Sequence, residues 1–292
     1  MGESVGLIGL GLVGTAIAER LLAEGFEVLG FDIDSAKCDQ LVKSGGKIAQ
    51  SAAEVGEKTQ RVILSLPETS VVLEVVEGAG GILEAATAAR YVIDTTTGDP
   101  DETAALAKRL ANDGIEFLDA PFSGSSGQVR NKEVVFMVGG EKSAFEACGD
   151  IFEALSDKIF YLGESPSGSR AKLASNLILG LNRLALAEGL VFAGKLGLEL
   201  EGFLELLKVT PAYSAAMDVK GKKMLAGDFE PQARLRQHCK DVSIILKYAQ
   251  ELGQELPLSK AHLDVLEKAT EAGDGDLDNS AVIREIQRRG GK

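Results

Sequence analysis

The sequence predicts an α/β protein with a mostly parallel sheet in residues 1–164 and an all-helical domain in residues 165–292, joined by a long interdomain helix. Three observations support this fold class. Strand-like and helical runs alternate through the first half, a glycine-rich turn joins the first strand to the first helix, and no convincing strand follows residue 164. Strands that alternate with 10–15-residue helical patterns are typical of βαβ units.

The first half contains short apolar runs that are typical of buried parallel strands. Helical patterns lie between most of them, for example at residues 15–24 and 101–112. The expected strands are Val5–Ile8, Glu27–Phe31, Arg61–Leu64, Tyr91–Ile93, Glu116–Leu118 and Val134–Val138.

The second half keeps a helical period from its start. Ser165 is a candidate N-cap and Pro166 a candidate first helical residue. Helical periodicity then continues to Gly197, for about eight turns at ~3.6 residues each. The remainder is expected to be helical, with breaks near Pro211, Gly227, Pro257 and Gly273–Asp276.

Composition narrows the function classes. The chain of 292 residues is 45% hydrophobic and carries a formal net charge of −13, which disfavours nucleic acid and anionic membranes as partners. It has no run of about 18 uncharged apolar residues and no signal-peptide pattern, so we expect a cytoplasmic protein without a membrane span. The three scattered cysteines, Cys38, Cys148 and Cys239, are expected to be reduced thiols.

The turn Gly9-Leu10-Gly11-Leu12-Val13-Gly14 has the spacing G-x-G-x-x-G between a strand and a helix. Gly9 would permit the tight turn, Gly11 would let the backbone approach a pyrophosphate, and Gly14 would let the helix pack close to the strand. The free N–H groups of the helix N-terminus would face the phosphates. The alternative is a tight turn without a ligand, but the context favours a Rossmann dinucleotide-binding domain.

Asp32 ends the second strand, at the spacing where an acid binds the adenine ribose hydroxyls. Its carboxylate and that of Asp34 would repel a 2′-phosphate, and no Arg occurs between Ile33 and Ala36 to attract one. We therefore expect NAD rather than NADP.

Gly168, Lys172 and Asn176 recur every four residues and share one face of the long helix. One interpretation is structural: Lys172 snorkels to solvent and Asn176 bonds a nearby backbone group. The other is chemical. Lysine gives up its proton readily when it is desolvated or near a second cation, so Lys172 could act as general acid and base with Asn176 as a hydrogen-bonding partner.

The stretch "DAPFSGSSG", residues 119–127, follows an expected strand. Ser123, Gly124 and Ser125 offer two hydroxyls and backbone N–H groups that could bind a carboxylate. A plain surface turn is the alternative.

At these residues the chain resembles the β-hydroxyacid dehydrogenase family along nearly its whole length. "GLIGLGLVG" is similar to the family's cofactor fingerprint, and "SLP" and "IDTTTGDP" resemble its two nucleotide-side loops. "DAPFSGSSG", "SGSRAKLASN" and "KGKKMLAGDFEP…HCKD" resemble its substrate loop, its catalytic helix and its C-terminal closing segment.

The resemblance implies a homodimer or homotetramer and assigns roles to residues. Lys172 would be the catalytic lysine and Asn176 its partner, and the further positions at the cofactor would be Leu66, Pro67, Thr97 and Lys240. The chain departs from the family pattern at Pro166, Ser125, Ser175, Val71 and the stretch 130–132. These departures bear on the substrate more than on the lysine.

Other candidate sites are weaker. His238 and His262 have no convincing site context, which disfavours a histidine acid, and no ligand set for zinc is apparent. The acids of 274–285 mimic a calcium loop, but Asn279 stands where the sharp-turn glycine belongs; we expect an acidic loop in which Asp278 or Asn279 caps the last helix. "KGKK", residues 220–223, is expected to be a solvated helix face, with an anion site as the alternative.

We therefore expect an NAD-dependent oxidoreductase of small 3-hydroxy or 2-hydroxy acids and their aldehydes, without a metal. The alternatives are a catalytically silent NAD-binding scaffold and an imine reductase-like enzyme, of which the latter usually lacks the lysine. Apolar residues along the long helix, Leu173, Leu177, Leu181, Leu184 and Ala185, favour a homo-oligomer.

Overall fold

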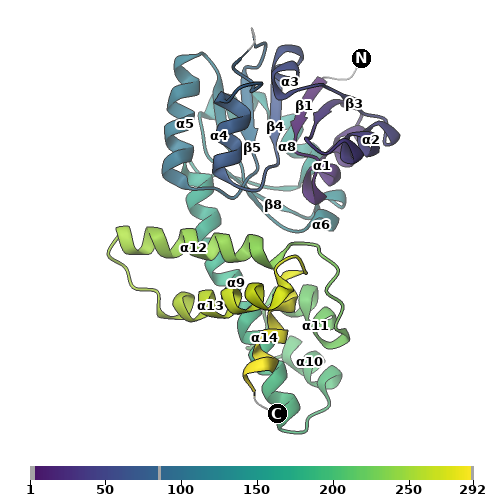
Figure 1. Ribbon diagram of the computed structural model, residues 1–292, viewed down its shortest axis with the longest axis vertical. Helices are drawn as coiled ribbons and strands as arrows, with labels where there is room; N and C mark the ends of the chain where they lie inside the picture. The colour runs from purple at the N-terminus through teal and green to yellow at the C-terminus, as the bar shows by residue number, and fades with distance from the viewer. Residues whose placement is uncertain (1–3, 85–86, 291–292) are drawn as a thin grey trace. The chain divides into compact units, whose positions relative to one another are not determined.

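The computed structural model describes residues 4–84 and 87–290, and it divides into two compact units, Met1–Lys172 and Leu173–Lys292. The division lies inside the long helix α9 (Ser167–Lys195), eight residues beyond the boundary that the sequence suggested. The fold is α/β in the first unit and helical in the second, as predicted (Figure 1).

The first unit is built on a six-stranded parallel sheet in the order β3-β2-β1-β4-β5-β6, the order of a Rossmann fold. All five strands expected in this sheet are present within one residue of their expected ends. Their bounds are β1 (Ser4–Ile8), β2 (Glu27–Phe31), β4 (Arg61–Leu64), β5 (Tyr91–Asp94) and β6 (Glu116–Asp119), and the additional edge strand is β3 (Lys47–Ile48).

Two hydrophobic clusters hold the sheet between its helices, because buried parallel strands expose apolar side chains on both faces. One cluster includes Val5, Leu7 and Ile63 with residues of α1 and α8, and the other includes Ile8, Val62 and Leu64 with residues of α3, α4 and α5. The helices of this unit are α1 (Leu12–Ala23), α2 (Ser35–Lys43), α3 (Ala52–Lys58), α4 (Thr69–Glu77), α5 (Pro100–Asn112), α6 (Ser126–Arg130), α7 (Lys142–Ala147) and α8 (Gly149–Leu155).

A second, three-stranded sheet also lies in the first unit. It consists of β7 (Phe122–Ser123), β8 (Val135–Val138) and β9 (Lys158–Tyr161), with β7 antiparallel and β9 parallel to β8. The expected strand at 134–138 is therefore present but belongs to this small sheet, which the sequence did not predict.

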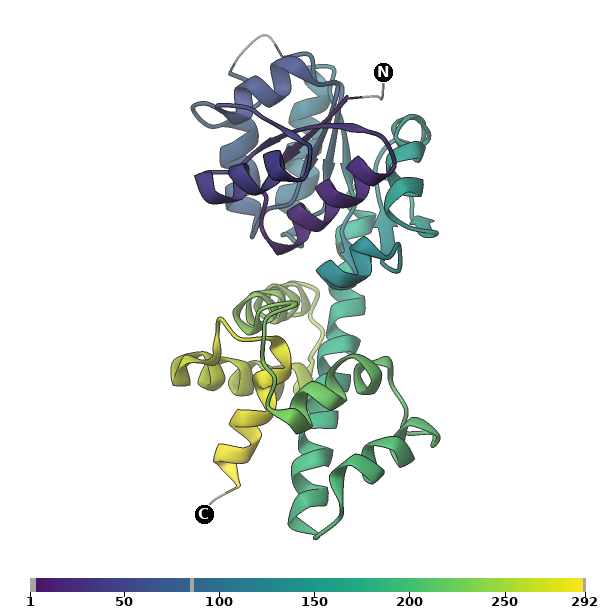
Figure 2. The same ribbon diagram turned by 90° about the vertical axis from the view of Figure 1, so that its right-hand side faces the viewer.

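The second unit is helical throughout its described residues, with breaks where they were expected. Around the C-terminal part of α9 lie α10 (Leu200–Lys208), η1 (Met217–Gly221), α11 (Lys222–Ala226), α12 (Leu235–Glu251), α13 (Pro257–Ala269), η2 (Thr270–Asp274), η3 (Asn279–Ala281) and α14 (Val282–Arg289). Helices α12 and α13 pack side by side (Figure 1 and Figure 2). Gly227 ends α11 in the left-handed region at φ 66°, which glycine adopts without strain.

Among the described residues, α9 alone is long and apolar enough to cross a membrane by length and composition. The core helix of a globular unit meets the same criteria. Buried Lys172, Asn176 and Arg183 interrupt its apolar surface.

The start of α9 corrects the predicted cap. The helix begins at Ser167 rather than Pro166, and the Ser165 hydroxyl makes no capping bond. The reason is a distant carboxylate: Asp119 Oδ2 accepts a hydrogen bond from the Ser169 backbone N–H at 2.7 Å. This carboxylate takes the place of a local cap.

Candidate active site

The glycine turn after β1 is closely packed at two of its three glycines. Gly9 has φ +93°, and a Cβ added there would lie 2.3 Å from the Ser65 carbonyl oxygen. A Cβ added at Gly14 would lie 1.9 Å from the Gly9 carbonyl oxygen. Both positions therefore require glycine, one for the turn and one for the contact between helix and turn.

Gly11 differs, because a Cβ added there would meet no atom within 4 Å. It is the N-cap of α1, and no side chain caps this helix. The first N–H groups of α1, which include those of Leu12 and Val13, therefore border open space in which a ligand can approach the backbone closely. This is the donor arrangement that a pyrophosphate needs, so the turn fits a dinucleotide.

Asp32 is tied directly to this turn. Its Oδ2 accepts the Leu10 backbone N–H at 2.7 Å, and its Oδ1 accepts the Asp34 N–H at 2.9 Å. Lys37 Nζ lies 3.4 Å from Asp32 Oδ1, a cation that the sequence analysis did not consider. The carboxylate is thus held at the end of β2, beside the glycine turn, where a ribose would be bound.

The residues of the two expected nucleotide-side loops follow β4 and β5. Leu66 donates its N–H to Thr96 Oγ1 at 3.3 Å, and the Leu66 side chain lies 3.1 Å from where a Gly9 Cβ would be. Pro67 is exposed and Thr97 half-buried. Because β4 pairs with both β1 and β5, these loops lie at the same sheet edge as the glycine turn.

The stretch 119–127 leaves β6 at this edge and forms β7 and the start of α6. Ser123 is half-buried and pairs with Val135 in the small sheet. Gly124 has φ +151°, and an added Cβ would lie 2.6 Å from Val134 Cγ1, so glycine is required there as well. The turn is built by these constraints and exposes the Gly124 backbone.

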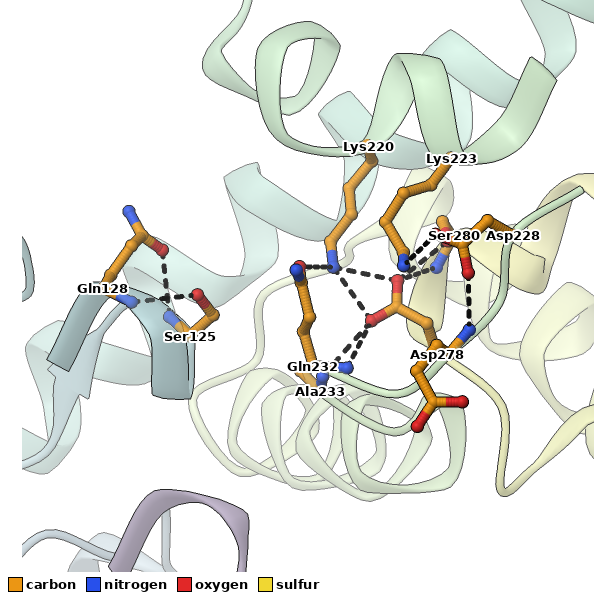
Figure 3. Close-up of polar contacts among 10 residues, drawn as sticks. Ser125, Gln128, Lys220, Lys223, Asp228, Gln232, Ala233, Asp278 and Ser280 are labelled. Carbon is orange, nitrogen blue, oxygen red and sulfur yellow. Dashed lines mark hydrogen bonds and ion pairs between the residues drawn. The ribbon is translucent and has the colours of Figure 1, made fainter. Parts of the chain in front are cut away.

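Ser125 is also a helix cap. Its Oγ accepts the Gln128 backbone N–H at 3.4 Å, and its own N–H donates to Gln128 Oε1 at 2.9 Å, a capping box at the start of α6 (Figure 3). Its backbone N–H therefore has a partner within the chain. Within the described part of the chain, the Ser125 hydroxyl hydrogen, the Ser123 hydroxyl and the Gly124 N–H remain as donors for a ligand.

Lys172 is only 8% exposed, and its Nζ donates a hydrogen bond to the Phe122 carbonyl oxygen at 2.7 Å. The side chain therefore does not snorkel to solvent. Its amine lies against the residue that precedes Ser123, in the same unit as the glycine turn and Asp32. An amine beside a loop of hydrogen-bond donors can exchange a proton with a carbonyl or hydroxyl oxygen held there.

Asn176 is one turn further along α9 and is also buried. Its Nδ2 donates to Asp241 Oδ2 at 2.9 Å, and Lys240 Nζ lies 3.3 Å from Asp241 Oδ1. The partner of Asn176 is thus a carboxylate on α12 and not the backbone group that was expected. Sequence analysis singled out Lys240 and passed over its neighbour Asp241.

Lys220 and Asp278 correct the reading of "KGKK" as a solvated face. Lys220 is buried, and its Nζ lies 2.8 and 2.9 Å from the two carboxylate oxygens of Asp278, which is fully buried (Figure 3). Asp278 also accepts the Gln232 and Ser280 N–H groups. Burial alone would raise the pKa of Asp278, but Lys220 and these donors outweigh it and lower the pKa to about 2.

The other acids of 274–285 have basic partners: Asp274 pairs with Arg284 and Arg288, and Glu285 pairs with Arg288 and Arg289. Asp278 caps the short η3 through the Ser280 N–H, whereas the last helix, α14, has Ala281 at its N-cap and no side-chain cap, so the expected cap of the last helix is wrong. Among the described residues, no group of three or more His, Cys, Asp or Glu side chains could hold a metal ion.

His238 and His262 are both buried, with ring centroids 5.2 Å apart. Burial and the neighbouring Arg183 charge lower the pKa of His262 to about 4, so this ring is neutral at physiological pH. The buried ring pair is a packing element of the second unit.

Comparison with known proteins agrees with this geometry. Residues 4–163 match the family described as the NAD binding domain of 6-phosphogluconate dehydrogenase, and residues 166–286 match that described as NAD-binding of NADP-dependent 3-hydroxyisobutyrate dehydrogenase. Glyoxylate/succinic semialdehyde reductase 1 of Arabidopsis thaliana is 32% identical over 97% of this chain and 98% of its own length. The 2-(hydroxymethyl)glutarate dehydrogenase of Eubacterium barkeri is 31% identical over 96% of this chain and 94% of its own.

Among solved structures, 3-hydroxyisobutyrate dehydrogenase of Mycobacterium tuberculosis, determined with L-serine, superposes with a TM-score of 0.85 at 26% identity. The superposition covers 98% of this chain and 100% of that chain. Both halves of the sequence are matched in order, and the two full-length relatives named above are oxidoreductases of hydroxy acids or semialdehydes. The chain belongs to the β-hydroxyacid dehydrogenase family.

Proposed function

We propose that this protein is an NAD-dependent oxidoreductase that interconverts small 3-hydroxy or 2-hydroxy acids and the corresponding aldehydes. The observation that carries the proposal is the buried Lys172 amine, 2.7 Å from the Phe122 carbonyl and next to the donor loop 123–125. The named substrates of the full-length relatives, glyoxylate, succinic semialdehyde and a hydroxymethyl dicarboxylate, are of this chemical class.

Bound nicotinamide would supply or accept the hydride at the carbinol carbon. The protonated Lys172 side chain gives a proton to the carbonyl oxygen during reduction, and the neutral amine takes the hydroxyl proton during oxidation. The Phe122 carbonyl orients the amine, while Ser123, Gly124 and the Ser125 hydroxyl hold the substrate carboxylate. Asn176, itself held by Asp241, orients the lysine or the substrate.

Asp32 supports NAD as the preferred cofactor. A carboxylate fixed by the Leu10 and Asp34 N–H groups would accept ribose hydroxyls and repel a 2′-phosphate. Lys37 works against this preference, but its ammonium is already near both Asp32 and Asp34, which weakens its attraction for another anion.

We further propose a homodimer or homotetramer in the cytoplasm. Leu173 and Leu184 are buried within the chain, so they do not supply the apolar surface expected of them. Ile178 and Phe192 of α9 do, as does Leu196 directly after the helix, each being more than half exposed. Apolar side chains of α9, α10, α11 and α14 also line a groove of about 340 Å³ in the second unit. Exposed apolar surface of this kind favours contact with a second copy.

The test is an NADH-oxidation screen over small semialdehydes and glyoxylate, with Lys172 variants beside the wild type. Lys172→Ala should lose about 10²–10⁴-fold in kcat, the typical contribution of a general acid–base group, and should still bind NADH. Lys172→Arg should fail too, because a guanidinium does not give up its proton. Asn176→Ala should raise KM more than it lowers kcat.

Lys260→Ala, which alters an exposed lysine of α13, is the matched control and should behave as wild type. Turnover of Lys172→Ala within about threefold of wild type would refute the acid–base role. NADH binding without turnover of any compound would favour the silent scaffold, and turnover of imines alone would favour the imine reductase.

A further inference from the structure

Two short segments of the first unit are joined at both of their ends. Asp119 Oδ2 accepts the Ser169 N–H at 2.7 Å, and three residues later in each segment Lys172 Nζ donates to the Phe122 oxygen at 2.7 Å. Both bonds span 50 residues of sequence. The turn 119–122 and the first turn of α9 are therefore held in a fixed register, with Asp119 at one end and Lys172 at the other.

The close packing around Asp119 prevents the two segments from shifting along each other. A Cβ on Gly168 would lie 2.3 Å from the Asp119 carbonyl oxygen and 2.5 Å from that of Met137. A Cβ on Gly139 would lie 2.4 Å from Asp119 Oδ1 and 2.8 Å from Ser167 Oγ. The start of α9 thus rests directly on the ends of β6 and β8.

The Asp119 carboxylate faces donors from α9 and has no cation beside it. It is 1% exposed and forms no ion pair within the described residues. Besides the Ser169 N–H, the hydroxyls of Ser165 and Ser167 surround it. An ionised carboxylate at a helix N-terminus accepts the free N–H groups and is attracted by the helix dipole, so it fixes the first turn more firmly than a neutral cap.

We propose that Asp119 is a positioning residue for Lys172: its buried carboxylate anchors the first turn of α9 and so sets where the Lys172 amine meets the Phe122 carbonyl. The inference rests on the proposed function of Lys172. It adds a residue that does not touch the substrate but governs turnover, because a displacement of about 1 Å in a reacting group can cost about 10²-fold in rate.

The test is a double-mutant cycle in the reduction direction. Asp119→Asn keeps the size of the side chain but replaces one acceptor with an N–H₂ donor that faces the N–H groups and hydroxyls of α9. We expect kcat to fall at least tenfold while the dissociation constant of NADH changes less than twofold. In the Lys172→Ala background, the same substitution should change kcat by less than twofold, because Asp119 acts through Lys172.

Glu199→Gln is the matched control, since Glu199 caps α10 with the same kind of carboxylate–backbone bonds, and it should leave kcat unchanged. Wild-type kcat in Asp119→Asn, or an equal loss in both backgrounds, overturns the positioning role and leaves the function of Lys172 intact. Near-wild-type turnover in Lys172→Ala overturns the proposed function and, with it, this inference.

The pH profile of the wild type gives a second readout that needs no variant to fold. Burial raises the pKa of Asp119 to about 6, and among the described residues the groups that face it are the hydroxyls and N–H groups of Ser165, Ser167 and Ser169. Reduction needs Lys172 protonated, so Lys172 itself causes no loss of kcat at acid pH. We expect kcat for reduction to fall at least threefold below about pH 6 as Asp119 is protonated. A kcat that does not fall at acid pH overturns the inference.

Discussion

Replacing Asp119 with asparagine should make the free energy of unfolding less dependent on pH even as it impairs turnover. The pKa of this buried carboxyl is raised from 3.8 to about 6, mainly by burial. The folded state therefore binds a proton more readily than the unfolded state does. The contribution of Asp119 to stability is fully present below pH 3.8 and is lost as the pH rises through about 6.

The size of the effect follows from the two pKa values. Each unit of pKa difference corresponds to about 1.4 kcal/mol. Between pH 4.5 and pH 7.5 the free energy of unfolding of the wild type should therefore fall by about 2 kcal/mol because Asp119 ionises, and a neutral side chain causes no such fall. The free energy of unfolding of Asp119→Asn, relative to wild type, should rise by that amount over this pH range.

Urea denaturation of both proteins at pH 4.5, 5.5, 6.5 and 7.5 measures this difference directly. All other titrating groups are common to the two proteins. The way in which the difference between their free energies of unfolding changes with pH therefore reports on Asp119 alone. A difference that stays constant within about 0.5 kcal/mol from pH 4.5 to 7.5 would refute both the raised pKa and the argument from burial.

Three further predictions concern other contacts. Wild type should prefer NADH over NADPH in kcat/KM by at least about thirtyfold, equivalent to about 2 kcal/mol, and Asp32→Ser should shrink that ratio; equal kinetics in wild type contradict it. Phe192→Asp should shift light scattering toward the monomer, whereas a wild-type mass near 30.7 kDa would exclude an oligomer. Lys220→Met should lower the free energy of unfolding by about 3 kcal/mol at pH 7, because buried Asp278 loses its cation; a loss under about 1 kcal/mol contradicts it.

The parallel strands of the first unit could be predicted because each is a short apolar run that ends at a turn. The strands that were missed carry no such signal. β3 has two residues, both exposed, and β9 exposes Lys158 and Phe160. Their backbone pairing with a neighbour, rather than their side chains, makes them strands. The partner of a strand is a tertiary property, so the membership of 134–138 in a separate sheet could not be read from its residues.

The candidate site divides in the same way. The glycine turn, Asp32 and Lys172 follow from residue types at fixed local spacings. Gln128, Asp241 and Asp119 were not found, because each acts through a bond to a backbone or side chain whose position depends on the fold. Gln128 alone had a local signal, since Ser125 and Gln128 form the S-x-x-Q pattern of a capping box.

Two buried carboxylates of this chain show what distinguishes a structural acid from one with another role. Asp278 has an ammonium group and several backbone donors, and its pKa is lowered to about 2, so its charge stabilises the fold. Asp119 has no cation beside it among the described residues, and its pKa is raised to about 6, so its ionisation costs stability as the pH rises through that value. A neutral asparagine at position 119 would avoid that cost. A costly charge at the anchor of the helix that carries Lys172 is therefore better explained by turnover than by stability, since groups with strongly shifted pKa values cluster at functional sites.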